Sequence, residues 1–461
     1  MASVCLATAL SAQTMPSDDP LLQPLPEFVR PASGQPLLAD EVQFEQMLTS
    51  AATNSPAMRQ QEDSVSQADA SRFRSWMRQM PVLTASYSAG VYYQTNITGS
   101  SGSKFTPGGS FTLQASRPLW HWGAFDAQTG LGKLTEQIAQ NDAILAYAQL
   151  CLDLRKRYHE LIILKAQAAT LAAKVESSQH RLDKANLLLK LGRSTPAQAS
   201  RFVLDFNELQ LNRDAAAASF KAKLADFRRL SGSSSFEADD VPGYIIGPVI
   251  DQSNLQAQFD DYKKNGFNES LAAHGAGLNE KALDRQITIN NANRKPMFDL
   301  TASVSQAPYI NSANNGLKFG TIFFFGVTGS WSLFDRGDSF AATEALYARK
   351  RQAENKLADT RQQTFDDATA SLDRIDLNLR ALGVLKSQYQ QQQDDYRRIQ
   401  LLQNSGQTEQ TEMDDSRDAL LDTRQQILSR QAEIADAYYS FLSDLFRDPA
   451  LANAPPFTKP R

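Results

Sequence analysis

Side chains that could carry catalysis or hold a metal ion are few in this sequence and lie far apart. The histidines are His121, His159, His180 and His274, and none has a companion ligand at a useful spacing. The sequence contains no serine–histidine–aspartate signature and no phosphate-binding loop. These observations predict that the protein is not an enzyme and that it needs no cofactor or metal ion.

The two cysteines, Cys5 and Cys151, predict neither a disulfide framework nor a clustered metal site. Cys151 lies in a stretch with a helical pattern, and we expect it to be a small buried apolar residue. The formal net charge of −4 gives no electrostatic reason to expect nucleic acid as a partner. No apolar run reaches about 18 residues, so a transmembrane helix is not expected, whereas short alternating strands could still cross a membrane.

The N-terminal residues, "MASVCLATALSAQ", leave two interpretations open. A short apolar segment runs from Val4 to Leu10, and Ala7-Thr8-Ala9 has the pattern of a signal-peptide cleavage site. Because no basic residue precedes the apolar segment, residues 1–12 are either a truncated secretory signal, which we favour, or an ordinary disordered terminus. The valine before Cys5 disfavours a lipid anchor.

The rest of the chain repeats one large unit at an offset of about 214 residues, which is far longer than a solenoid repeat. The landmarks that recur are Asn54 with Asn268, Pro81 with Pro296, Leu119 with Leu333, Gly123 with Gly337, and Gly192 with Gly406. We therefore expect two tandem repeats, residues 37–231 and 267–447, joined by an inter-repeat segment at 232–266. A proline-rich linker at 13–36 and a disordered tail at 448–461 would flank them.

Each repeat is expected to begin with a helix, at about 55–79 and 269–294, that ends before a proline. Two strands with alternating apolar and polar residues should follow. Their expected ranges are about 82–94 and 109–119 in the first repeat, and about 297–306 and 318–333 in the second. The last strand would place Phe319, Phe323, Phe325, Val327, Trp331 and Leu333 on one face.

Two hairpins on a soluble sheet would explain the alternation, but they do not explain so aromatic a face. A membrane barrel explains it better, with apolar faces toward lipid and serine, threonine and glutamine faces toward water. Four strands cannot enclose a pore, and a membrane-spanning sheet cannot leave open edges. The strands of several chains would have to be pooled by oligomerisation.

Long proline-free stretches follow each pair of strands and predict helices at about 126–190 and 338–403. Some 65 helical residues would span roughly 100 Å, and their heptad spacing predicts coiled-coil packing. Gly192 and Gly406 should end these helices in tight turns, and returning helices are expected at about 196–230 and 408–446. Each repeat would then be a β-hairpin joined to a long α-helical hairpin.

This order of elements resembles the TolC-type outer membrane efflux proteins over nearly the whole chain, from about Pro36 to Asp448. The stretches that carry the resemblance are "NSPAMRQQEDSVSQADA", "QMPVLTASYSAGVY", "SRPLWHWGAFDAQ", "LLKLGRST", "RKPMFDLTASVS", "SWSLFDRGDSF", "LQNSGQTE" and "EIADAYYSFLSDLF". The resemblance implies a mixed α and β membrane protein. It would be a homotrimer whose twelve-stranded β-barrel is continued by a periplasmic α-helical coiled-coil tunnel.

The resemblance also implies a function and partners. The protein would be the outer membrane exit duct of a tripartite efflux pump or a type I secretion system in a Gram-negative bacterium. It would conduct small molecules or exported substrates passively across the periplasm and the outer membrane. A periplasmic adaptor (membrane fusion) protein would join it to an inner-membrane transporter, and outer membrane lipids would surround its barrel. The alternative is a non-channel periplasmic coiled-coil adaptor or structural protein of an export complex.

The resemblance places acidic residues of the returning helix at the periplasmic entrance. Counted from Gly406, these positions are Glu412 and Asp415, and Asp414 adds a third carboxylate. In a trimer they would form rings of like charge that favour cations, although the same residues could be an ordinary solvated helix face. The family often places an arginine and a tyrosine near this glycine, where the present sequence has Thr408 and Gln403. The lock of a closed entrance should therefore differ from the usual one.

Two further groups of residues follow from the resemblance. The tip turns expected to dock the adaptor are Leu191, Gly192, Arg193 and Ser194 in the first repeat and Ser405, Gly406, Gln407 and Thr408 in the second. The expected strand-to-helix junctions contain Trp120, Trp122 and Gly123 in the first repeat and Phe334 and Gly337 in the second. The aromatic rings would lie at the membrane interface, and the glycines would let the backbone change from strand to helix.

Overall fold

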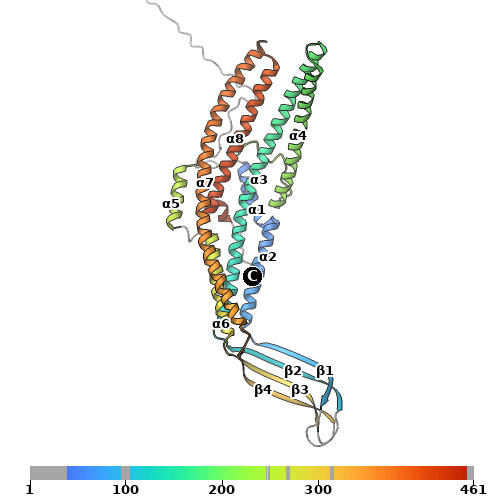
Figure 1. Ribbon diagram of the computed structural model, residues 1–461, viewed down its shortest axis with the longest axis vertical. Coiled ribbons are helices and arrows are strands. Elements are labelled where there is room, and N and C mark those ends of the chain that lie inside the picture. The colour runs from blue at the N-terminus through green and yellow to red at the C-terminus, as the bar shows by residue number, and fades with distance from the viewer. Residues whose placement is uncertain are drawn as a thin grey trace, which may run out of the picture. The chain divides into compact units, whose positions relative to one another are not determined.

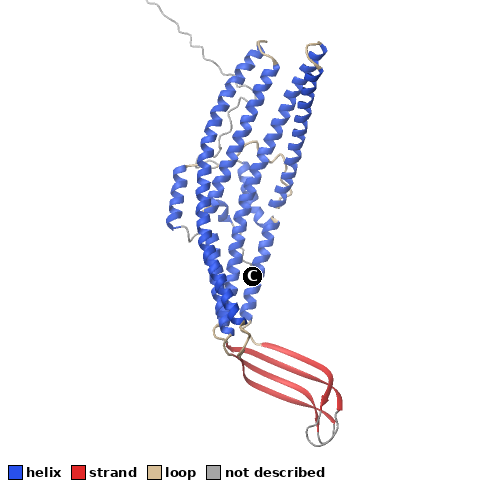
Figure 2. Ribbon diagram, in the orientation of Figure 1, coloured by secondary structure: helices blue, strands red, loops and turns tan. Residues whose placement is uncertain are grey.

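The computed structural model of the protein describes residues 39–94, 104–245, 247, 250–265, 270–311 and 316–453. The expected signal segment, the proline-rich linker and most of the expected tail lie outside these residues. The described chain is a mixed α and β fold that is mostly helical (Figures 1 and 2). Among its helices, none is long and apolar enough to cross a membrane.

The chain divides into two compact units. Unit 1 contains the described residues of Met1–Pro56, Ala148–Tyr262 and Asp366–Ala454, and unit 2 contains those of Ala57–Tyr147 and Lys263–Phe365. Two long helices, α3 (Ala124–Lys190) and α7 (Asp338–Asn404), contribute residues to both units.

Unit 2 contains a four-stranded antiparallel sheet with the strand order β1-β2-β3-β4, shown in red in Figure 2. Its strands are β1 (Val82–Gln94), β2 (Lys104–Trp120), β3 (Met297–Asn311) and β4 (Gly316–Ser330). The two central strands come from halves of the chain that are far apart in sequence, and Ser116 of β2 is paired with Thr301 of β3. The sheet therefore joins the two strand pairs that the sequence predicted.

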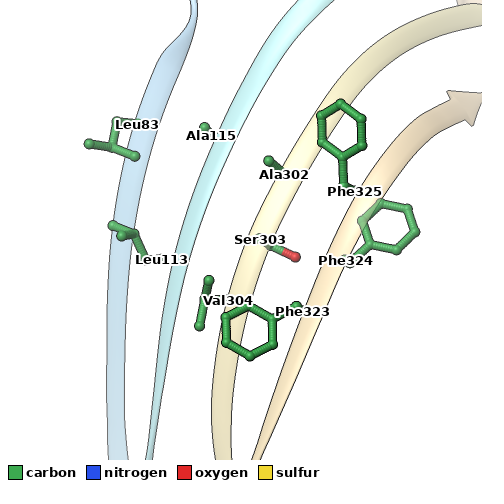
Figure 3. Close-up of a pocket in the computed structure, with 9 residues that line it drawn as sticks. All are labelled: Leu83, Leu113, Ala115, Ala302, Ser303, Val304, Phe323, Phe324 and Phe325. Carbon is green, nitrogen blue, oxygen red and sulfur yellow. The ribbon is translucent and has the colours of Figure 1, made fainter.

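The register gives this sheet one apolar face, as the alternation predicted. Leu83 is paired with Ala115, Leu113 with Val304, and Val304 with Phe323, so these side chains lie on one face. Figure 3 shows nine residues from all four strands lining a shallow hollow on the sheet. The large side chains of the apolar face are exposed, and they are Leu83, Tyr87, Val91, Phe111, Leu113, Phe319, Phe323, Phe325 and Val327.

Hydroxyl groups on the opposite face are hydrogen-bonded across the strands. The bonded pairs are Ser88 with Ser110 at 2.7 Å, Thr112 with Ser305 at 3.0 Å, and Thr301 with Thr328 at 2.8 Å. Ile322 and Phe324 are apolar exceptions on this polar face, because they alternate with Phe323 and Phe325 along β4. The sheet thus presents one face suited to lipid and one that is largely suited to water.

Three strand boundaries differ from the expected ones. β2 begins at Lys104 and β3 continues to Asn311, because cross-strand pairing extends into both stretches that we interpreted as loops. β4 ends at Ser330, so Trp331 and Leu333 do not lie on the strand. Instead, Trp331 Nε1 donates a hydrogen bond to the carbonyl of Arg294 at 3.2 Å, which holds it beside the end of the preceding helix.

Helices α2 (Pro56–Met77) and α6 (Leu271–Asn293) pack against the part of α3 that lies in unit 2. A Cβ added to Gly132 of α3 would lie 3.0 Å from Cβ of Ser75, so α2 and α3 approach closely at this point. An ion pair of 2.8 Å between Arg72 and Glu136 joins the same two helices. On the other side, Asn141 Nδ2 donates to the carbonyl of Leu271 at the start of α6.

Unit 1 consists of two long helical hairpins and shorter elements (Figure 1). The hairpins are α3 with α4 (Pro196–Ser231) and α7 with α8 (Gln410–Asp444). The shorter elements are α1 (Ala39–Asn54), α5 (Gln252–Asn265) and the 3-10 helix η2 (Pro449–Asn453). We did not predict α1 or η2, and the expectation of disorder is wrong for 448–453, where η2 forms and Asp448 and Ala450 are buried. The two long hairpins, α2 and α6 lie close to their expected ranges.

An apolar seam joins α7 and α8 at the seven-residue spacing of a coiled coil. Its buried members are Leu382, Tyr389 and Tyr396 from α7 and Leu420, Ile427 and Ile434 from α8. Cys151 of α3 is fully buried, which confirms that it is a small core residue.

A carboxyl group at the end of α8 is sensitive to pH. Burial raises the pKa of Asp444 to about 7, the charge of Asp367 on α7 adds to this, and Lys156 on α3 opposes it. Between about pH 4 and pH 7 the folded chain therefore holds a proton that the unfolded chain has released. The contribution of Asp444 to stability falls as the pH rises through this range, and above pH 7 the fold bears the full cost of the buried charge.

We expect Asp444→Asn to stabilise the protein at pH 8 by about 1–3 kcal/mol and to have little effect at pH 4. The measurement is the midpoint of thermal unfolding, followed by circular dichroism, at both values of pH. Asp373→Asn is the control, because this aspartate is exposed on α7. An equal effect of Asp444→Asn at both values of pH would contradict the assignment.

Candidate functional site

Both tip turns have the same backbone geometry. Gly192 has a φ of 68° and Gly406 a φ of 74°, which is the left-handed region that favours glycine. After the first long helix, the amide of Arg193 donates to the carbonyl of Leu188 at 2.9 Å. After the second, the amide of Gln407 donates to the carbonyl of Leu402 at 2.9 Å. This is the Schellman motif, so the glycines end the two helices in the same way.

The two returning helices begin differently. Thr195 and Gln198 form a capping box at the start of α4, in which each side chain accepts a hydrogen bond from the other residue's amide. Glu409 precedes α8 without a side-chain cap, and its carboxylate instead pairs with Lys184 of α3. Of the eight predicted tip residues, Ser194 and Thr408 are half-buried and the other six are exposed. Both turns are therefore open to a partner.

The three predicted entrance carboxylates have different surroundings. Glu412 is exposed and, within the described part of the chain, has no ion-pair partner. Asp415 is exposed and lies 2.7 Å from Nη2 of Arg181 on α3. Asp414 is only 1% exposed, and its carboxylate lies 2.9 Å from Nδ1 of His180. The structure thus separates the buried Asp414 from the other two carboxylates.

A chain of hydrogen bonds crosses the second tip and ends at Asp414. Gln403 on α7 donates to the side-chain oxygen of Gln410, and Gln410 Nε2 donates to Asp414 at 3.1 Å. Gln403 occupies the position at which the family resemblance implies a tyrosine. The amides of Gln403 and Gln410 therefore tie α7, α8 and the His180 side chain of α3 together through one buried carboxylate.

Polar contacts join the C-terminal part of α3 to the N-terminal part of α8 and its cap residue, and we call this set the α3–α8 polar ladder. Its ion pairs are Lys174 with Asp422 at 2.6 Å, Arg181 with Asp415 at 2.7 Å and with Asp418 at 3.0 Å, Arg417 with Glu176 at 3.2 Å, and Lys184 with Glu409. Ser177 Oγ also donates to Asp418 at 2.9 Å. Basic side chains lie mainly on α3 and acidic ones mainly on α8.

Sequence reasoning missed this ladder, although the sequence contains its signal. Lys174, Ser177 and Arg181 follow the three-and-four spacing of a coiled-coil seam, and Asp415, Asp418 and Asp422 follow the same spacing on the other helix. Matched in antiparallel order, the two sets predict the observed pairs. The predicted entrance contained the acidic residues of α8 without their basic counterparts on α3.

Asp418 lies at the centre of the ladder. Burial raises the pKa of its carboxyl group, whereas the hydrogen bonds from Ser177 and Arg181 and the charge of Arg417 lower it, and the net direction is upward. Arg417 is itself engaged, because Nη2 donates to Ser177 Oγ at 3.0 Å and to the carbonyl of Ala173 at 3.2 Å. The ladder is therefore a connected network rather than a set of isolated surface pairs.

The two strand-to-helix junctions of unit 2 contain matching backbone turns. Trp122 and Gly123 have φ values of 53° and 80°, and Arg336 and Gly337 have φ values of 58° and 82°. Two successive left-handed residues therefore turn the chain at each junction, and the first of them is not glycine. Sequence reasoning identified both glycines and Trp122 as junction residues, but it identified neither Arg336 nor the left-handed backbone of the residue before each glycine.

Side-chain contacts hold the first junction in place. Trp122 Nε1 donates to the carbonyl of Pro296 at 2.7 Å, and His121 Nε2 lies 2.8 Å from Asp299. The ammonium group of Lys295 lies 4.8 Å from the centre of the Trp122 ring. The junction residues Trp120, Trp122 and Phe334 are exposed.

At the second junction, the carboxylate of Asp335 accepts hydrogen bonds from the amides of Gly337 and Ser339. Hydrogen bonds from Ser339, together with that from Gly337, lower the pKa of Asp335. In the part of the chain that the structure describes, no three histidine, cysteine, aspartate or glutamate side chains are grouped so that they could hold a metal ion.

The fold is similar to those of several solved outer membrane proteins. The protein VceC from Vibrio cholerae matches with a TM-score of 0.66 and 14% sequence identity, over 88% of this chain and 96% of VceC. The Campylobacter jejuni channel CmeC matches with a TM-score of 0.66 and 12% identity, over 90% of this chain and 87% of CmeC. The Neisseria gonorrhoeae channel MtrE, in its open state, matches with a TM-score of 0.64 and 14% identity, over 88% and 90% of the two chains.

Comparison of the sequence with protein families decides the identification. Residues 268–441 match the family described as outer membrane efflux protein. This stretch is an outer membrane efflux protein domain. A search of curated protein sequences finds no match.

The outer membrane efflux protein domain confirms the family resemblance that the sequence motifs predicted. It spans the second expected repeat and contains Gly406, Glu412, Asp414 and Asp415. Outer membrane efflux proteins are channel proteins and not enzymes, so the predictions of an outer membrane location and of no enzymatic activity are confirmed as well.

Proposed function

We propose that this chain is the outer membrane exit duct of a tripartite efflux pump or a type I secretion system. It conducts small molecules or exported substrates passively across the periplasm and the outer membrane. The observation that carries this proposal is the connection of an amphipathic four-stranded sheet to two long helical hairpins within an outer membrane efflux protein fold. The sheet suits a membrane barrel, and the helical hairpins suit a periplasmic tunnel.

The proposed assembly is a homotrimer of chains that each contain two tandem repeats. Several features support the repeats: the same order of elements in each half, the same positive-φ pairs at the junctions, and the same Schellman turns at the tips. β1 and β4 are the edges of the described sheet. Pairing β4 of one chain with β1 of the next in a trimer would give a twelve-stranded barrel without open edges.

Exposed apolar side chains on the helices of unit 1 also support association with further copies. Leu204 and Leu211 on α4 are 66% and 69% exposed, and they are separated by one heptad. Leu377 and Val384 on α7 are 67% and 68% exposed, with the same separation. Such stripes bury little within one chain, and they match the spacing at which coiled-coil neighbours pack.

The remaining assignments concern partners and sites. In this proposal the two tip turns dock a periplasmic adaptor, which connects the duct to an inner-membrane transporter. Trp120, Trp122 and Phe334 belong to the aromatic belt next to the lipid headgroups. Glu412 and Asp415 line the periplasmic entrance, and Asp414 holds its neighbouring helices together through His180 and Gln410.

The alternative, a non-channel periplasmic adaptor, is not favoured. The family match is to an outer membrane efflux protein, and the exposed apolar sheet face has no purpose in a protein surrounded by water.

The test is conductance in planar lipid bilayers by protein extracted from the outer membrane in detergent. We expect a trimer in light scattering and discrete conductance steps from the native chain. The double variant Leu204→Glu/Leu211→Glu should lose the trimer and the conductance, because six charges would be brought into a coiled-coil interface. Arg213→Glu is the control, since this residue lies on the opposite side of α4, and it should retain both properties. A native protein that is monomeric and soluble without detergent would contradict the proposal.

A further inference from the structure

Arg181 occupies a special position among the charged residues near the tips. It belongs to α3, yet its guanidinium group reaches across to two carboxylates of α8. Nη2 lies 2.7 Å from Oδ1 of Asp415 and 3.0 Å from Oδ2 of Asp418. The Arg181 side chain is 27% exposed, so water screens these contacts only in part.

No other basic side chain of the α3–α8 polar ladder is placed to neutralise Asp415 in place of Arg181. Lys174 is bound to Asp422, and Lys184 is bound to Glu409. Arg417 is on α8 itself, where it pairs with Glu176 and donates hydrogen bonds to Ser177 and Ala173. Arg181 is therefore the cation on which Asp415 depends for neutralisation.

The distribution of charge around the candidate entrance follows from these pairs. Glu412 is exposed and, among the described residues, has no ion-pair partner. Asp414 is buried beside His180, so it is withdrawn from the solvent. The carboxylate of Asp415 is 68% exposed, but Arg181 places a positive charge next to it. The negative potential of this region thus depends on the carboxylate of Glu412 and on how far the charge of Arg181 offsets the charges of the carboxylates beside it.

We propose that Arg181 is a selectivity-determining residue of the entrance, where it offsets the charge of Asp415 and Asp418 and so limits the preference of the channel for cations. Glu412 then supplies the part of the negative potential that no basic residue opposes. This inference rests on the proposed channel function, and it differs from an entrance controlled by acidic residues alone. It predicts that removal of a positive charge from α3, and not only of negative charges from α8, changes which ions pass.

The experiment measures the potassium-to-chloride permeability ratio of the full-length protein in planar bilayers across a potassium chloride gradient. Arg181→Gln should raise this ratio about two- to fivefold, because the trimer loses three positive charges that lie next to the carboxylates of the proposed entrance. The effect should shrink in about 1 M salt, where charges are screened within about 3 Å. Glu412→Gln should change the ratio in the opposite direction.

Three further variants separate a charge effect from a structural one. Arg181→Lys keeps the charge and should keep the native ratio. Arg213→Gln removes an arginine that pairs with Asp214 on its own helix, and it should leave the ratio unchanged. Arg181→Gln combined with Asp415→Asn restores the local net charge and should return the ratio toward the native value.

Should Arg181→Gln fail to assemble, Asp415→Asn/Asp418→Asn in the native background tests the same idea. This variant leaves Arg181 without its partners and should shift the ratio toward chloride. Unchanged permeability ratios in conducting variants would overturn the assignment of Arg181 and leave the channel intact. Absence of conductance from the native protein would instead overturn the proposed function itself.

Discussion

Gly232→Ala should destabilise the protein severely, although it adds only one methyl group. Gly232 ends α4 with a φ of 69°, in the left-handed region. A Cβ at this position would lie 2.5 Å from the carbonyl carbon of Asn54 and 2.9 Å from its Cβ. These atoms belong to the last residue of α1, so most of the obstruction is backbone that cannot move aside by changing a rotamer.

The expected cost of Gly232→Ala combines two effects. A left-handed conformation costs a residue with a Cβ about 1–2 kcal/mol, and overpacking against fixed atoms adds about 1–3 kcal/mol or more. We therefore expect a loss of about 3–5 kcal/mol in the free energy of unfolding, seen as a large fall in the thermal midpoint.

Two other glycines provide matched controls for Gly232. Gly406 has a φ of 74° but open space around it. Gly406→Ala should therefore lower the free energy of unfolding by only about 1–2 kcal/mol, because only the left-handed backbone disfavours alanine there. Gly243 has open space and no positive φ, so Gly243→Ala should be close to neutral. If all three substitutions had similar effects, the close approach of α1 and α4 would not be the cause.

Patterns that repeat along the chain allowed much of this fold to be predicted from the sequence. β1 occupies Val82–Gln94, the range that its alternation indicated, because a half-exposed strand places every second side chain on one face. The long helices α3 and α7 follow from proline-free heptads in the same way. The sheet boundaries near Lys104 and Asn311 were harder to predict, because glycine, serine and asparagine remain in strand where a neighbouring strand pairs with them.

The candidate entrance shows what the sequence pattern could not reveal. Glu412, Asp414 and Asp415 are close in sequence, but successive residues of a helix point in different directions, so their surroundings differ. The burial of Asp414 depends on His180, which is 234 residues away along the chain. Only the packing of α3 against α8 brings the two residues together. The periodicity of a single helix does not show which residue of another helix will contact it.

Asp448→Asn should be the second strongly destabilising substitution. The Asp448 carboxylate forms a two-point ion pair with Arg155 of α3, with Nη2 3.0 Å from Oδ1, and both side chains are almost fully buried. Burial lowers the pKa of Arg155, but the hydrogen bond and charge of Asp448 outweigh this effect, together with Tyr439 and Cys151, so the net pKa is raised. Arg155 therefore remains charged inside the fold, with its guanidinium carbon 4.0 Å from the centre of the Tyr439 ring.

Loss of one partner is costly because it leaves the other charge buried without compensation. We expect Asp448→Asn to lower the free energy of unfolding by about 3–5 kcal/mol. The side-chain oxygen of the new asparagine would still accept the hydrogen bond from the backbone N–H of Ala450. The start of η2 would therefore be preserved. Asp214→Asn, which breaks an exposed pair with Arg213, should cost about 0–1 kcal/mol and serves as the control.

The double variant Arg155→Met/Asp448→Asn decides between two explanations of that loss, and its asparagine keeps the acceptor for the Ala450 amide. If the buried charge is the cause, the double variant should recover most of the stability that Asp448→Asn loses, because neither charge then remains in the interior. If the geometry of the ion pair itself holds the C-terminal segment against α3, the double variant should be as unstable as the single one. Thermal unfolding and proteolysis of the C-terminal segment would measure the two contributions separately. We expect recovery, because methionine at position 155 can pack against the Tyr439 ring that the guanidinium group contacts.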